Sequence, residues 1–229
     1  MKQPPNKKSV LDLVGLALVI LAFAVSAWAY EGLPDQVPSH WNVRGEVDGW
    51  IPKPFGPFAL PTVMLGIYVL LRVVPRISPQ GFQVEGFTRA YEIMKIAILG
   101  MLLMTSVVAT LSGLGYPVPV GRFVQGGVGV LFIVLGNYMG KVTRNFFVGI
   151  RTPWTLANQE VWLRTHRLGG RLMVLAGLIC VVSALLNVLS LAVLISTVLL
   201  AAAAPIAYSY LLYRRLEAKG PKGEGPASG

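Results

Sequence analysis

The chain has 229 residues, of which 54% are hydrophobic and only 13% are charged. Soluble domains carry about 25% charged residues, so this composition excludes an ordinary soluble domain and indicates an integral membrane protein surrounded by membrane lipid. The formal net charge is +10. Membrane proteins gather Lys and Arg in their cytoplasmic connections, and no nucleic-acid-reading motif accompanies the charge, so we expect no direct nucleic acid partner.

Six apolar segments are long enough to cross a bilayer. They lie at about 10–30, 55–74, 91–112, 122–140, 171–188 and 191–213. Lys and Arg dominate both tails and the connections 72–90 and 140–171, but not the connections 31–54, 113–121 and 187–190. The positive-inside rule then predicts an all-α membrane protein with six transmembrane helices and both termini in the cytoplasm. Five spans, with the last two segments folded in another way, are the alternative.

Few ionisable residues fall inside these segments. Asp12 lies near the start of the first one, where its charge can reach the membrane interface. Glu92 and Lys95 lie in the first turn of the third and have the i, i+3 spacing of a helical ion pair. The fourth is rich in glycine, and its Gly136-x-x-x-Gly140 is typical of close helix packing. The scarcity of ionisable groups at depth argues against a proton-coupled pump.

The connection 31–54 is extracytoplasmic in this topology. Its many Pro and Gly residues predict an irregular loop, with a short hairpin turning at Arg44–Gly45 as the alternative. His40, Glu46 and Asp48 are ligand types that first-row metal ions accept, but their spacing matches no metal motif. We therefore expect no metal and no cofactor, with His40 and Asp48 as the metal candidates to inspect.

The connection 145–171 is the most polar stretch between apolar segments. Asn158 is a suitable N-cap and Gly169–Gly170 a suitable end, which predicts an amphipathic cytoplasmic helix near 159–168, suited to lie on the membrane surface. Helical spacing places His166 beside Trp162. A lone histidine is more often a hydrogen-bonded structural residue than a ligand.

Neither polar connection contains a nucleophile–base pair or a known catalytic motif, so we expect no enzyme activity. A membrane enzyme is an alternative that would need His40 with Asp48, or His166 with Glu160, to converge on a cleft. A small-molecule or peptide transporter is a second alternative. It would need a polar cavity at mid-membrane, which the glycine-rich segment 122–140 could line.

Two stretches resemble a known family. The first, LPDQVPSHWNVRGEVDGWIPK, resembles the signature of a bacterial membrane domain of unknown function. The second, GNYMGKVTRNFFVGIRTPWTLANQEVWLRTHRLGGRL, resembles the C-terminal signature of the SdpI family. The resemblance implies an N-terminal membrane domain at 1–115, an SdpI-like domain at 116–215 that contains the cytoplasmic motif 145–171, and a tail at 216–229 that we expect to be disordered.

The resemblance also implies a function. It predicts a multi-pass protein of the bacterial cytoplasmic (inner) membrane that gives immunity against a secreted peptide toxin and couples toxin sensing to the capture of a small repressor. The cytoplasmic positions that would bind the partner are Asn145, Gly149, Arg151, Thr152, Trp154, Glu160, Trp162, Thr165, His166 and Arg167. The extracytoplasmic positions that would meet the ligand are Pro38, His40, Asn42, Gly45, Asp48 and Gly49.

Overall fold

The computed structural model describes residues 10–42, 44–78, 84–188 and 191–218. Its elements are α1 (Val10–Ala29), η1 (Tyr30–Gly32), β1 (Gln36–Trp41), β2 (Val47–Pro52), α2 (Gly56–Val73), η2 (Val74–Ile77), η3 (Val84–Phe87), α3 (Thr88–Gly113), α4 (Val120–Met139), α5 (Pro153–Ala157), α6 (Gln159–Leu185) and α7 (Leu191–Glu217). Six helices within the described residues, α1, α2, α3, α4, α6 and α7, are long and apolar enough to cross a membrane. The predicted six-span helical architecture is therefore confirmed.

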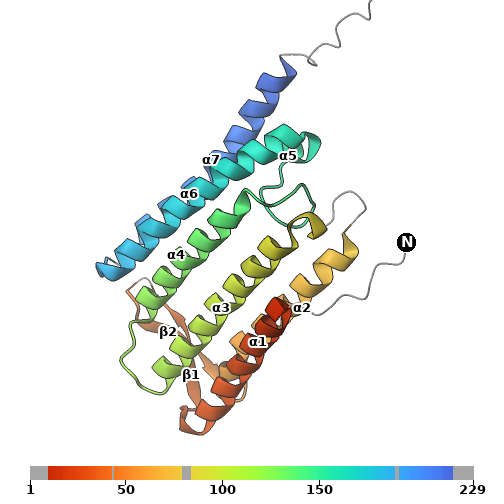
Figure 1. Cartoon of the computed structure of the whole chain (residues 1–229). Helices are drawn as coiled ribbons and strands as arrows, with labels where there is room; N and C mark the ends of the chain where they lie inside the picture. The colour runs from red at the N-terminus through yellow and green to blue at the C-terminus, as the bar shows by residue number, and fades with distance from the viewer. Residues whose placement is uncertain (1–9, 43, 79–83, 189–190, 219–229) are drawn as a thin grey trace, which may run out of the picture.

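The helices form a bundle with two distinct ends. α1, α2 and α3 make one group, α4 lies beside α3, and α6 and α7 lie on the other side of α4 (Figure 1). The β1–β2 hairpin covers one end of the bundle, which we call the hairpin side. We call residues 140–158, which include α5, the linker, and the opposite end of the bundle the linker side. The charge pattern predicts that the linker side is cytoplasmic.

Glycine allows α4 and α6 to pack backbone against backbone. A Cβ atom at Gly136 would lie 2.6 Å from the carbonyl oxygen of Gly170, and one at Gly129 would lie 2.7 Å from that of Gly177. Gly129 and Gly136 are seven residues apart on α4, and Gly170 and Gly177 are seven residues apart on α6. This spacing is about two helical turns, so each helix has its two glycines on one face. The predicted second member of the packing pattern, Gly140, does not take part, since its Cβ would have ordinary room.

Two predicted helix boundaries are wrong. The amphipathic helix expected at 159–168 is the first part of α6, which continues without a break through Gly169 and Gly170 to Leu185. The glycine pair does not stop the helix because these residues make its close contacts with Ile150 and with α4. α7 extends to Glu217, so the tail expected from 216 starts within a helix, and its residues from 219 onward lie outside the described part of the chain.

Candidate functional site

The connection between α1 and α2 is a β-hairpin rather than the irregular loop that its composition predicts. β1 and β2 pair antiparallel from Gln36 opposite Pro52 to Trp41 opposite Val47. Gly45 has φ +80°, a left-handed conformation that glycine adopts without strain, so the hairpin turns where the alternative prediction placed it. Proline and glycine are tolerated here because both strands of a two-stranded sheet are edge strands.

An exposed polar network closes the turn. The Asn42 side-chain oxygen accepts the backbone N–H groups of Arg44 and Glu46 at 2.8 and 3.1 Å. The Glu46 carboxylate accepts from the Asn42 amide and from the Arg44 guanidinium, both at 2.8 Å. These two contacts, Asn42 first, lower the pKa of Glu46 below its usual range.

The hairpin brings two of the predicted ligand residues together. His40 Nδ1 lies 2.5 Å from Asp48 Oδ1, and both side chains are exposed. Gly49 is paired with His40, and a Cβ there would lie 2.9 Å from the His40 Cβ. Glu46, the third metal candidate, turns to Arg44 instead. Among the described residues, no group of three or more His, Cys, Asp or Glu side chains could hold a metal ion.

The other face of the hairpin is fixed to the bundle. Val37 is buried together with Ala29 and Leu33. A Cβ at Gly113, the last residue of α3, would lie 2.8 Å from a Leu33 methyl group. The half-buried Pro38 also lies against Gly113. The hairpin is therefore packed against α1 and α3.

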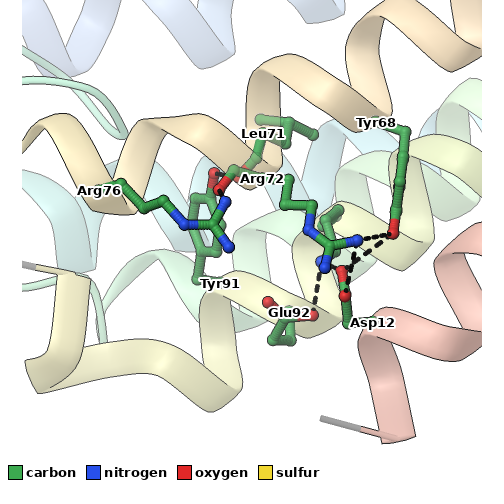
Figure 2. A network of polar contacts seen from close by, with 8 residues as sticks. Asp12, Tyr68, Leu71, Arg72, Arg76, Tyr91 and Glu92 are labelled. Atoms are coloured by element: carbon green, nitrogen blue, oxygen red, sulfur yellow. Dashed lines mark hydrogen bonds and ion pairs between the residues drawn. The ribbon is translucent and has the colours of Figure 1, made fainter. Parts of the chain in front are cut away.

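A buried charge network joins α1, α2 and α3 near their linker-side ends (Figure 2). Lys95 Nζ lies 3.0 Å from Asp12 Oδ1 and 2.7 Å from Glu92 Oε2. Arg72 Nη1 lies 3.2 Å from Asp12 Oδ2 and donates to the Tyr68 hydroxyl at 2.8 Å. That hydroxyl donates to Asp12 at 3.3 Å. Two acids face two bases, so the network is neutral.

Burial makes this network costly to break. The Lys95 side chain is only 2% exposed, and those of Asp12 and Glu92 are 13% and 14% exposed. Removing one partner of a buried ion pair leaves an uncompensated charge, which costs about 3–5 kcal/mol. The predicted Glu92–Lys95 pair is confirmed. Asp12 lies near the end of α1, as predicted, and its side chain is turned into the bundle, where it pairs with Lys95 and Arg72.

A second buried network shapes the linker and contains no ion pair. The Asn145 side-chain oxygen accepts the N–H groups of Phe147 and Val148 at 2.8 and 2.7 Å, and its amide donates to the Thr143 and Val148 carbonyls at 2.8 and 3.1 Å. Trp162 Nε1 donates to the Val142 carbonyl at 2.8 Å. Asn145 and Trp162 are both fully buried. Each of their polar atoms therefore has a partner supplied by the linker backbone.

His166 fixes the linker to α6. Its Nε2 accepts the Ile150 N–H at 3.0 Å, so Nδ1 carries the proton and donates to the Trp162 carbonyl at 2.8 Å. Its ring stacks on Trp162 with 4.0 Å between ring centroids. Gly149 has φ +106°, and a Cβ there would collide with His166 Nε2. The predicted structural role of His166 is confirmed.

The linker also docks on α7. Thr152 caps α5 reciprocally with Thr155, and its hydroxyl lies 3.1 Å from that of Ser209. Trp154 packs on Tyr210 with 5.0 Å between ring centroids. Asn158 then caps α6, as predicted, by accepting the Glu160 N–H at 2.8 Å.

The ten predicted partner-binding residues divide by exposure. The buried ones are Asn145, Thr152, Trp162, Thr165 and His166. The half-buried ones are Gly149 and Trp154, and the exposed ones are Arg151, Glu160 and Arg167. The apolar face predicted to lie on the membrane packs against the linker instead. Half of the signature is therefore buried and holds the linker on α6 and α7, and the exposed charges are its most accessible residues.

The two buried networks are neighbours in space. Tyr91 and Met94 of α3 belong to one apolar cluster with Val142 and Trp162. Tyr91 also donates its hydroxyl hydrogen to the Leu71 carbonyl of α2 at 2.5 Å. The linker-side ends of α2 and α3 are thus packed directly against the linker.

The chain is 30% identical to the immunity protein SdpI of Bacillus subtilis (strain 168) over 211 residues, which is 92% of this chain and 98% of that one. The chain belongs to the SdpI/YfhL protein family. Residues 141–209 match that family directly, and residues 17–65 match a domain of unknown function, DUF1648. No solved structure matches the chain.

Membership and fold together place the protein in the bacterial cell membrane as a multi-pass protein. The charge network lies outside both matched segments. Asp12 precedes residues 17–65, and its partners on α2 and α3 fall between that segment and residues 141–209. The sequence analysis did not predict this network. One signal for it was present, because all four charges lie near helix ends on the same side of the predicted topology.

Proposed function

We propose that this member of the family is a membrane immunity protein that protects its host against a secreted antimicrobial toxin. The observation that carries the proposal is the 30% identity to an immunity protein across 98% of that protein's length. The match covers 92% of this chain, which supports a shared architecture and, with it, a shared function.

The hairpin is the surface that would meet the toxin. In the predicted topology it faces outward, and it exposes the His40–Asp48 pair beside Arg44. Trp50 is 55% exposed on the same hairpin. Exposed aromatic and charged side chains on a fixed backbone suit the recognition of a peptide.

Coupling to the cytoplasm would run through the helices that carry the hairpin. The hairpin links α1 to α2, and the charge network binds the far ends of the same two helices to α3. α3 packs against the linker through the cluster that contains Trp162. A displacement of the hairpin would then change the linker and the start of α6, where the exposed Arg151 and Arg167 would hold an acidic surface of a small repressor. Such coupling requires two sites and two states.

The two alternatives, a membrane enzyme and a transporter, have less support. His40 and Asp48 meet, but both are exposed on the hairpin. His166 is buried while Glu160 is exposed, so this second pair does not converge. The glycine-rich α4, which a transporter would use to line a polar cavity, lines an apolar groove instead. The four charges of the network pair with one another near the helix ends rather than at mid-membrane.

The test is survival. Cells that lack their own immunity protein would express this chain and be exposed to the secreted peptide toxin that kills them. We expect protection by the wild type, loss of protection with Trp50→Ala, and retained protection with Arg151→Ala plus Arg167→Ala. The double variant should instead lose repressor capture. Unchanged killing at verified membrane levels of the wild type would refute immunity for this member.

A further inference from the structure

A groove of about 830 Å³ separates α3 from α4 in the hairpin half of the bundle. On the linker side these helices are joined by the apolar cluster around Tyr91 and Leu135. Beyond it, residues between Ala97 and Met104 of α3 line one wall of the groove, Pro119 and residues of α4 as far as Val134 line the second, and the end of α6 forms the third. The exposed Phe123 and Val130 place the opening of the groove toward the lipid.

Missing side chains create this space. A Cβ at Gly100 would meet nothing within 4 Å, and one at Gly126 would meet only the Ala184 Cβ, at 3.5 Å. Met101 and Met104 lie over Gly127. Methionine is flexible and polarisable and adapts to irregular apolar ligands. The groove is therefore an apolar channel whose two methionines can adapt to a ligand.

Arg122 lies at the hairpin-side end of the groove. Of the described residues that line the groove, it is the only charged one. Its Nε and Nη2 donate to the Ala184 and Leu185 carbonyls at 3.2 and 3.5 Å. In the part of the chain that the structure describes, no acid forms an ion pair with it. The Arg122 guanidinium has five N–H donors, and those not used by the two carbonyls are available to an anionic group at the end of the groove.

We propose that the groove binds an anionic phospholipid of the hairpin-side leaflet, with an acyl chain between α3 and α4 and the phosphate on Arg122. Guanidinium groups bind phosphate through several hydrogen bonds at once. A lipid fits better than a peptide because the walls offer no side-chain partners for a peptide backbone, which cannot leave its polar groups unpaired in an apolar channel.

The experiment uses the full chain, reconstituted in equal amounts of phosphatidylglycerol and phosphatidylcholine and then released for native mass spectrometry. We expect the wild type to retain phosphatidylglycerol. Gly100→Leu fills the groove and should retain about tenfold less phosphatidylglycerol. A tenfold loss of affinity requires the loss of burial of only about two lipid methylenes. Gly66→Leu is the matched control, because a Cβ at the exposed Gly66 also meets nothing within 4 Å but lies outside the groove. It should behave as the wild type.

Arg122 is tested separately. Arg122→Gln should abolish the preference for phosphatidylglycerol over phosphatidylcholine, and Arg122→Lys should keep it. If Arg122 serves only to cap α6, Arg122→Gln will lower the melting temperature without changing the lipid preference, which overturns the headgroup assignment. Equal retention by Gly100→Leu and Gly66→Leu, or a wild type that carries no lipid, overturns the groove as a lipid site. None of these readouts depends on toxin immunity.

Discussion

Two buried polar networks lie on the linker side, one made of charges and one of neutral groups. The charge network draws Asp12, Arg72 and Lys95 from three helices that contact one another in the membrane. The neutral network satisfies Asn145 from residues two or three positions away and ties Trp162 to the linker backbone. Partners are thus distant along the chain in the first network and mostly local in the second.

This difference bears on what each network can do. Ion pairs among helices depend on how those helices are placed, so the charge network is sensitive to any shift of α1 or α2 against α3. Hydrogen bonds within a short linker move with the linker and preserve its shape. The charge network is therefore suited to respond to a displacement of the helices. The neutral network is suited to keep the linker surface in one shape.

The largest expected effect is in the charge network. Lys95→Met leaves Glu92 without its cation and Asp12 with Arg72 alone, and we expect a loss of about 3–5 kcal/mol in unfolding free energy. Adding Glu92→Gln to the Lys95→Met variant should restore part of the lost unfolding free energy. Unfolding in mixed detergent would measure both. Arg164→Gln, which breaks the exposed pair with Glu160, is the control and should cost about 0–1 kcal/mol. Equal effects of the two single variants would contradict the comparison.

A smaller effect is expected at Gly149 in the neutral network. In Gly149→Ala the alanine must adopt a positive φ, which costs about 1–2 kcal/mol of unfolding free energy. Its Cβ also displaces the His166 ring from the Ile150 N–H. The melting temperature should fall, and proteolysis of the linker should accelerate. Gly140→Ala is the matched control, because its φ is −68° and its Cβ would lie 3.6 Å from the nearest atom. A stable Gly149→Ala would show that the linker can adopt another shape.

Trp162 tests a single hydrogen bond. Trp162→Phe keeps an aromatic ring on His166 but orphans the buried Val142 carbonyl, for which we expect a loss of about 1–3 kcal/mol. Trp50→Phe, at the exposed hairpin tryptophan, should leave unfolding unchanged in the same assay. If both variants unfold alike, water reaches the linker network and the network is not buried in solution.

The smallest effect is expected in the exposed network of the hairpin turn, which serves as a baseline. Because Asn42 and Arg44 lower the pKa of Glu46, its contacts are complete above the ordinary glutamate pKa of about 4.3 and are lost as the pH falls through the lowered value. The Asn42 side-chain amide resonance should titrate in that acid range, and Glu46→Gln should remove the titration. A titration above the ordinary range would contradict the geometry.

Several of these features could be predicted from the sequence, and the reasons are local. A lipid environment demands continuous apolar segments of about 20 residues, so the six spans were readable. The Asn158 cap, the Glu92–Lys95 pair and the position of His166 beside Trp162 follow from spacing within one helix. Glycine at position 45 marked the turn of the hairpin.

Other features depended on packing between distant segments. Asp12 and Lys95 are 83 positions apart, and only the packing of α1 on α3 brings them together. Gly169–Gly170 reads as a helix end in isolation, but Gly170 meets Gly136 of α4 and the helix continues. The ten predicted partner-binding residues of the linker and α6 were expected to form a surface, yet five of them are buried.

The membrane class, the number of spans, the predicted topology and the local caps follow from the amino-acid sequence, because they depend on composition and on neighbours within a helical turn or two. The packing of the helices is needed to know which charges meet, which signature residues are exposed and where the bundle is open. Those outcomes depend on how helices rotate and approach one another, and the periodicity of a single helix does not specify the partner that its inner face will find.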